Sequence, residues 1–269
     1  MVESLSEAWS GDTLLLYGVG TYCVLLGSWA ASSAPFVALN HFGIAERYRI
    51  QPASGGGSPV SSEIYKIALR MVSTNWILVF FAVTLGAPVI KWLFPADAPS
   101  PVACTLSRSL GVIVLWFFLH DFSFYWYHRV LHEVPSLYRR FHKPHHIFTA
   151  PFGWMSHATH PVELTLQSVG GMAGPLIWSF AYGLNLKTWW AWLALIQVQG
   201  VMDHCGYEFP WPLDLFGCLP GLGGTAFHDD HHRLFTCNYA AVFSVIDHIF
   251  GTSRSCKEAA KAKKQDKIS

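Results

Sequence analysis

The chain alternates between long apolar blocks and short polar segments, and it ends in a polar tail. A helix that crosses a membrane needs about 20 mostly apolar residues. Three blocks therefore predict membrane spans. Two later blocks, the second of them too short to span by itself, predict a helical hairpin that either crosses the bilayer or enters it and returns. The spans are Leu14–Leu39, Asn75–Phe94 and Leu106–Tyr127, and the hairpin is Leu164–Leu184 with Thr188–Val201.

The polar segments differ in charge, and this predicts an orientation. The loop at 51–62 has basic flanks, basic residues stand among the histidines, and the tail after Thr252 contains five lysines. The segment at 95–103 has no basic residue, and the first twelve residues are acidic. Because cytoplasmic loops carry an excess of Lys and Arg, the first loop, the histidine groups and the C-terminus are expected in the cytosol.

Composition supports a membrane protein and argues against two other classes. Apolar residues make up 52% of the chain and charged residues only 13%, whereas a soluble domain carries about 25% charged residues. A net charge of +1 gives no indication of nucleic-acid binding. The six cysteines are scattered without a C-x-x-C pair, which argues against a disulfide framework or a thiolate zinc site.

Two histidine clusters of the same form, H-x-x-H-H, stand more than eighty residues apart, in FHKPHH and FHDDHH. Neutral imidazole is a common ligand for iron, zinc, copper and nickel. On a helix, the three histidines of such a box fall on one side within about 100°, so one box can supply two metal ions. The clusters predict a polynuclear metal site built from both halves of the chain by His128, His132, His142, His145, His146, His228, His231 and His232.

The residues before His128 suggest a partner for this site. Asp121 and Tyr125 lie on the same helical stripe as His128. Asp121 could therefore fix an imidazole through its second nitrogen, or it could pair with Tyr125 or Arg129. His120 lies about 80° around the helix and is interpreted as structural.

Further polar residues leave their roles open. His160 in ATHPVE and His204 in DHCGYEFPW stand at the edges of the predicted hairpin, where polar groups are costly and often functional. From the residues alone they are ligands or structural histidines, and His157 is interpreted as a bystander. Asp229 is a candidate for supporting a ligand or delivering protons, although it and Asp230 could equally be solvated charges. All-nitrogen ligation suits iron and dioxygen better than structural zinc.

From Leu110 to Thr252 the sequence resembles the fatty acid hydroxylase / sterol desaturase superfamily of membrane non-haem di-iron enzymes. The resemblance rests on the segments HDFSFYWYHRVLH, FHKPHHIFTAPFG, HPVE, HCGYEFPW, GGTAFHDDHHRLFTCNYAAVF and DHIFGT. Within it, the chain is most similar to the C4-methylsterol oxidases. Sphingoid-base C4-hydroxylases share HPVE and DHCGY but differ more after them.

The resemblance implies a fold and a cofactor. The fold is an all-α integral membrane protein with about four transmembrane or re-entrant helices and a cytosolic helical cap that holds a di-metal site. His160 and His204 join the eight box histidines as implied ligands of two irons. Dioxygen and NAD(P)H-derived electrons are implied as co-substrates, with a reductase and usually cytochrome b5 as donors, in the endoplasmic reticulum membrane. The domains would be a membrane region (1–105), a catalytic domain (106–252) and a basic cytosolic tail (253–269).

The expected function is a lipid monooxygenase that oxidises the C4-methyl group of a sterol. Two enzyme alternatives keep the metal site and change the substrate to a sphingoid base or fatty acyl chain, or to an aldehyde. A non-enzymatic alternative is a membrane carrier of metal or haem. One departure concerns the substrate: His157 and Thr159 stand where the family often has glutamate and tyrosine before His-Pro, which could alter the lining of the substrate channel.

Overall fold

The computed structural model describes residues 9–51, 61–98, 106–210 and 219–255, and helices form the framework of this part of the chain. The predicted N-terminal, 51–62 and 95–103 segments lie partly outside these residues, and most of the basic tail lies outside them. Strand-like pairing in the described part is limited to one bridge, between Arg49 and Tyr207. The prediction of an all-helical membrane protein is confirmed.

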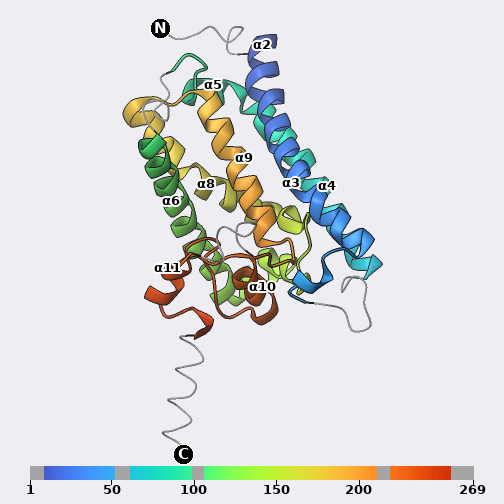
Figure 1. Ribbon diagram of the computed structural model, residues 1–269. Helices are drawn as coiled ribbons and strands as arrows, with labels where there is room; N and C mark the ends of the chain where they lie inside the picture. The colour runs from blue at the N-terminus through green and yellow to red at the C-terminus, as the bar shows by residue number, and fades with distance from the viewer. Residues whose placement is uncertain (1–8, 52–60, 99–105, 211–218, 256–269) are drawn as a thin grey trace, which may run out of the picture.

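Three helices are long and apolar enough to cross a membrane, at Gly11–Phe42, Ser62–Leu85 and Leu110–Glu133. The first is continuous from α2 through a π-helical stretch into α3, and the third belongs to α6. Figure 1 shows them beside a hairpin of two further helices, α8 and α9. The element bounds are α2 (Gly11–Thr13), η1 (Leu14–Gly20), α3 (Thr21–Phe42), α4 (Ser62–Leu85), α6 (Leu106–Glu133), α8 (Pro161–Tyr182) and α9 (Leu186–Asp203).

The predicted second span, Asn75–Phe94, was placed wrongly. α4 already begins at Ser62, where the Ser61 hydroxyl accepts a hydrogen bond from the Ile64 N–H, and it ends at Leu85. A separate short helix, α5 (Ala87–Leu93), follows Gly86. Hydropathy missed the polar first turns of α4 and ran across this break, because an apolar count registers neither a capping serine nor a helix-ending glycine.

The remaining short elements gather at one end of the bundle, the end where α10 and α11 lie in Figure 1. They connect the long helices and carry most of the predicted metal ligands. These elements are η2 (Glu46–Tyr48), α7 (Pro135–Leu137), η4 (Tyr138–His142), η5 (His145–Ile147), η6 (Met155–His157), α10 (Thr225–Leu234) and α11 (Ser244–Ile249).

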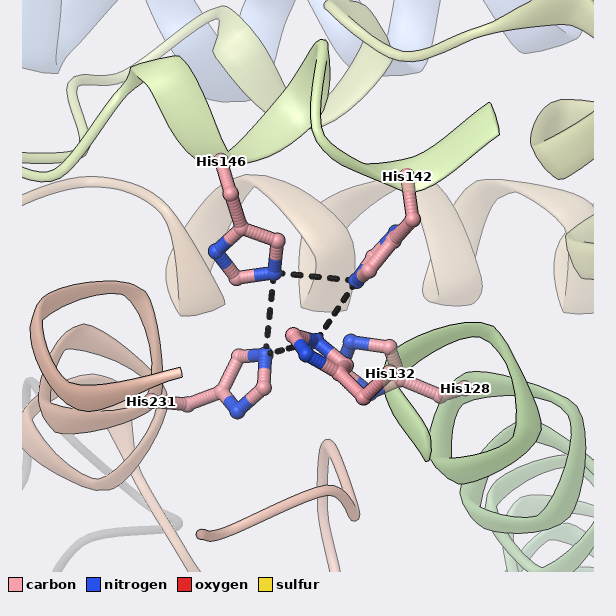
Figure 2. A group of neighbouring side chains, drawn as sticks. All are labelled: His128, His132, His142, His146 and His231. Atoms are coloured by element: carbon pink, nitrogen blue, oxygen red, sulfur yellow. Dashed lines mark hydrogen bonds between the residues drawn. The ribbon is translucent and has the colours of Figure 1, made fainter. Parts of the chain in front are cut away.

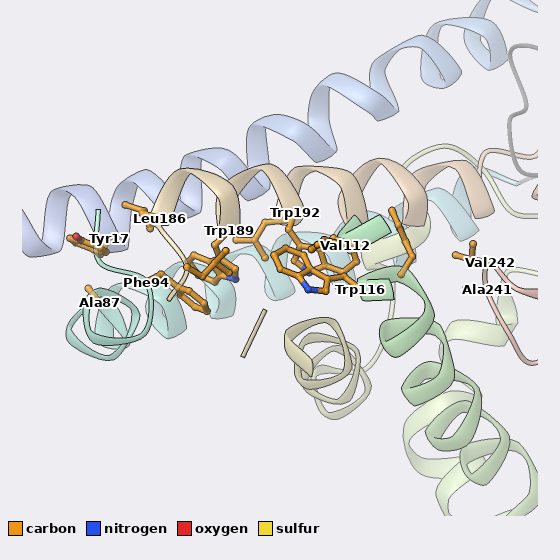
Figure 3. Packing of buried hydrophobic residues seen from close by; sticks show 13 residues of the cluster. Tyr17, Ala87, Phe94, Val112, Trp116, Leu186, Trp189, Trp192, Ala241 and Val242 are labelled. Atoms are coloured by element: carbon orange, nitrogen blue, oxygen red, sulfur yellow. The ribbon is translucent and has the colours of Figure 1, made fainter. Parts of the chain in front are cut away.

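A core rich in aromatic side chains holds the bundle together away from the histidines (Figure 3). Phe94 stacks on Trp189 with ring centres 4.5 Å apart, and Trp192 packs edge-on against Trp116. Other large apolar side chains point outward, among them Trp92, which is 70% exposed, and Phe180, which is 69% exposed. Outward apolar side chains on long helices are what a lipid environment favours.

The close approach of α8 to α6 depends on Gly174. A Cβ atom added there would lie 2.6 Å from Cδ1 of the buried Trp116. We expect Gly174→Ala to lower the free energy of unfolding by about 1–3 kcal/mol, because the indole cannot move without disturbing the core. Thermal unfolding in detergent measures this. Gly27→Ala is the matched control, since a Cβ there meets nothing within 4 Å; equal stability of the two variants would contradict the packing.

Candidate metal centre

Nine of the ten predicted histidine ligands converge in two groups, one of which is drawn in Figure 2. Within each group, the nitrogens that could bind a metal all lie within 4.8 Å of one another. The histidines come from α6, the η4–η5 segment, the end of α9 and α10, so both halves of the chain contribute. The first group is His128, His132, His142, His146 and His231, and the second is His145, His204, His228 and His232.

Each H-x-x-H-H box supplies both groups. In the second box, on α10, His231 belongs to the first group, whereas His228 and His232 belong to the second. In the first box, His145 is the residue that joins the second group. The expectation of one regular helix for the first box was wrong. His142 ends a wide π-helical turn and His145 begins a 3₁₀ turn, because Pro144 between them has no N–H to continue the helix.

Backbone carbonyls determine which ring nitrogen carries the proton. His145 Nδ1 lies 3.1 Å from the Ala158 oxygen, and His204 Nδ1 lies 2.7 Å from the Gly200 oxygen. Since a carbonyl only accepts, each Nδ1 must be the donor, which leaves a lone pair on each Nε2. These two Nε2 atoms lie 3.3 Å apart, so two lone pairs face each other and need a cation between them. The Nδ1 atoms of three further histidines donate to backbone carbonyl oxygens in the same way: His128 to Tyr239, His231 to Cys237 and His232 to Phe148.

Four of the five histidines in the first group, all except His128, have Nε2 atoms that form a closed ring (Figure 2). Going around it, the distances from His132 to His142, His146, His231 and back to His132 are 2.7, 2.9, 3.2 and 3.1 Å. Metal–imidazole bonds of about 2.0–2.1 Å at right angles separate neighbouring nitrogens by about 3 Å. The donor set of each group therefore fits a metal ion.

Burial keeps these imidazoles in the neutral form, which is the form that can bind a metal. Removal from water, together with the nearby His145, lowers the pKa of His204 to about 3. Burial likewise lowers the pKa of His231 to about 3. Neutral imidazoles at pH 7 present free lone pairs, so a metal does not have to displace protons there.

Glu163 supports the first group and was missed in the sequence. Its side chain is 2% exposed, and Oε2 lies 2.9 Å from Nδ1 of His142. It stands in the first turn of α8. A carboxylate in this position orients the imidazole and increases its basicity as a ligand. The available signal was an acidic residue within HPVE, at the start of an apolar helix.

Asp121 acts differently from its predicted role. Instead of touching an imidazole, its two carboxylate oxygens accept hydrogen bonds from the backbone N–H groups of Ala241 (2.7 Å) and Phe243 (2.6 Å). The same loop contains Tyr239, whose carbonyl oxygen accepts from His128 Nδ1. Helical spacing gave the correct stripe for Asp121 but could not show that this loop packs over it. Asp121 therefore positions His128 through the loop backbone.

We expect Asp121→Asn to destabilise this loop. An amide retains one acceptor oxygen, but its NH₂ group then faces a backbone N–H, which costs about 1–3 kcal/mol of stability for the unsatisfied buried groups. The measurements are thermal stability and metal content of the purified protein. Asp230→Asn serves as control, since that carboxylate makes ion pairs with Arg233 and Arg254 at the surface. A loss no larger than the control's would contradict the role of Asp121.

Asp229 is buried, in contrast to its neighbour Asp230, and its Oδ1 accepts a hydrogen bond from Gln51 Nε2 at 2.6 Å. Burial raises the pKa of Asp229 to about 6. Gln51 also donates to the carbonyl of Thr149. This contact ties the first loop to the box on α10, so Asp229 is a structural link and not a solvated charge.

The three remaining histidines near the site lie outside both groups. His160 caps α8, where its Nδ1 accepts from the Val162 N–H at 3.2 Å. The ligand role implied for His160 does not match this position, because the helix terminus uses its Nδ1 lone pair. His157 stacks on Trp76, with ring centres 4.6 Å apart. His157 and His120 both line the cavity described next.

A cavity of about 510 Å³ opens onto the second group. His145, His204 and His228 form part of its wall at one end, together with His128. From there it passes between α3, α4, α8 and α9, where most of the lining is apolar, including Leu25, Val79, Val83, Leu164, Leu193 and Ile196. Its size is in the range of sites that enclose small organic ligands.

Fold and site together define a helical membrane protein with a histidine-rich metal centre at the end of an apolar cavity. The chain belongs to the fatty acid hydroxylase family, whose model matches residues 113–252. This confirms the resemblance found in the sequence.

Several curated relatives match over most of the chain. A putative methylsterol monooxygenase of Dictyostelium discoideum is 34% identical over 90% of this chain and 84% of its own. Methylsterol monooxygenase 2-2 of Arabidopsis thaliana is 33% identical, covering 88% and 85%. The very-long-chain aldehyde decarbonylase GL1-11 of Oryza sativa is 31% identical, covering 98% and 97%. No solved structure matches significantly.

Proposed function

We propose that this protein is a di-iron, dioxygen-dependent monooxygenase that oxidises the C4-methyl group of sterols. The observation that carries the proposal is that histidines of the second group, together with His128 of the first, line an apolar cavity. The similarity to methylsterol monooxygenases supports an oxidoreductase and this substrate class. One iron would be held by each group, at imidazole nitrogens that include the five left unprotonated by the carbonyl contacts.

The residues of the chain would perform three tasks in this reaction. Nine histidines hold the metals, and Glu163 together with the backbone carbonyls orients their rings. The apolar wall excludes water and places a saturated carbon of the lipid beside the second group. Bound iron would supply the activation of dioxygen, which is cofactor chemistry that amino acid side chains cannot provide.

The cellular setting follows the same proposal. The metal-binding end and the C-terminus would face the cytosol at the endoplasmic reticulum membrane, where a reductase or cytochrome b5 would deliver NAD(P)H-derived electrons. The basic residues at this end support the orientation, among them Arg139 and Arg140 beside the first box. Protease protection of tags at the two termini in sealed microsomes tests it.

A second candidate function is conversion of a long-chain aldehyde, since the rice decarbonylase matches 98% of the chain. An apolar cavity accommodates either lipid. The two functions are separated by supplying each lipid to the same purified, iron-loaded protein and following which one is consumed.

The deciding experiment uses a host that lacks its own C4-methylsterol oxidase. Expression of this chain should clear the accumulated 4,4-dimethylsterols, and the purified protein should contain about two irons per chain and no haem absorption band. Stable, iron-loaded protein that leaves the dimethylsterols unchanged would contradict the sterol assignment.

A further inference from the structure

Seven buried polar atoms in the wall of the apolar cavity have no hydrogen-bond partner among the described residues, and two of them belong to uncharged, non-aromatic side chains. These two are Oγ of Ser156 and Oε1 of Gln199. Ser156 is 8% exposed and Gln199 is 4% exposed. Buried polar atoms are nearly always satisfied, and leaving one unpaired is costly. Unpaired atoms that line a cavity therefore indicate a group that the cavity receives.

The orientation of the Gln199 amide is fixed by its neighbour on α9. Its Nε2 donates to Oδ1 of Asp203 at 2.6 Å. Because a carboxylate oxygen accepts hydrogen bonds, only the NH₂ end of the amide can face it. Oε1 is therefore the unpaired end, and it is an acceptor that requires a donor. The opposite orientation would place two oxygens against each other.

Ser156, on η6, packs against α9 beside Gly200. Its Cβ would be 3.7 Å from a Cβ built on Gly200, the residue after Gln199. The carbonyl of Gly200 in turn accepts from Nδ1 of His204, a member of the second histidine group. Since four residues advance a helix by about 6 Å, the serine and glutamine lie within about two helical turns of a metal ligand.

The chemistry of these atoms selects one kind of ligand group. Oε1 of Gln199 needs a donor, and the Ser156 hydroxyl can donate or accept. A hydroxyl group can donate to Gln199 and accept from Ser156 at the same time. An aldehyde oxygen can only accept and would leave Gln199 unpaired, and a hydrocarbon would leave both unpaired. We infer that Ser156 and Gln199 form a subsite for a hydroxyl group of the substrate, beside the second histidine group.

This inference rests on the proposed function and deepens it. A C4-methylsterol bears its hydroxyl on C3, the ring carbon next to the one that carries the methyl group. Holding that hydroxyl at Ser156 and Gln199 would keep the methyl close to the second histidine group. The subsite thus favours an alcohol over a long-chain aldehyde, the substrate class of the rice relative.

Equilibrium binding tests the subsite without electron supply or turnover. The purified full-length protein in nanodiscs is titrated with labelled 4,4-dimethylsterol, which the free sterol and its 3-deoxy analogue then displace. The parent protein should bind the 3-deoxy analogue about tenfold or more weakly, because that analogue leaves buried polar atoms unpaired. Ser156→Ala and Gln199→Met should each reduce this preference to about threefold or less.

Ser168→Ala is the matched control, since its hydroxyl also lines the cavity but already donates to the carbonyl of Leu164. It should keep the preference of the parent. Should Gln199→Met fail to fold, Ser156→Ala decides alone, because it removes an atom that bonds to no described group. Equal binding of the two sterols by the parent, or an unchanged preference in Ser156→Ala, overturns the subsite. A parent that binds neither sterol overturns the proposed sterol function as well.

Discussion

Replacing His204 with alanine is expected to remove the metal of the second group and to abolish oxygenation. This group has four histidines, and losing one of its nitrogens weakens the hold on the ion enough for it to be lost during purification. Iron content should fall from about two to about one per chain. Activity should fall by at least about 10³-fold, the scale seen when one member of a cooperating catalytic unit is lost. Elemental analysis and sterol turnover of the purified variant measure the two effects.

The design separates the two groups from each other. His231→Ala removes a nitrogen of the first group's ring, and His204→Ala leaves that ring intact. His248→Ala is the histidine control, because this exposed residue on α11 belongs to neither group; it should keep full iron and turnover. Retention of both irons and of turnover in His204→Ala would contradict the division into two groups.

The sequence predicted the members of the two histidine groups more completely than the residues that support them. Spacing in H-x-x-H-H and H-x-x-x-H is local, so the eight box histidines could be recognised from their order alone. His204 has no box around it, and only the family motif DHCGY indicated its role. Helical spacing predicted that each box could supply histidines to both groups. It did not predict that the first box is divided between two different helical turns, which are separated at Pro144.

The hydrogen bonds that orient the histidines could not be predicted, because they join residues that are far apart in the sequence. Asp121 reaches backbone N–H groups about 120 residues later, and His145 donates to a carbonyl in a loop. A carbonyl acceptor has no sequence signature, since every residue carries one. The three long helices were predictable from apolar length, whereas the start of α4 and the break at Gly86 depend on capping and turn geometry that hydropathy does not register.

Glu163→Gln is expected to lower metal affinity and activity by about 10- to 100-fold, the usual effect of losing a partner that orients a ligand. The amide oxygen can still accept from Nδ1 of His142, but its negative charge is gone. Glu163→Leu removes the acceptor altogether and should lose more. Iron retention against a graded series of chelator concentrations, measured beside sterol turnover, determines the size of each effect.

The comparison between these two variants separates positioning from simple packing. Since the carboxylate is buried against His142, a role in packing alone would make leucine at least as good as glutamine. A role in orienting the ring gives the order Glu, Gln, Leu in both iron retention and turnover. Glu63→Gln is the control, because that exposed carboxylate on α4 pairs only with Lys66 in the described structure. Iron retention in Glu163→Leu equal to that of the control would show that His142 holds its orientation without Glu163.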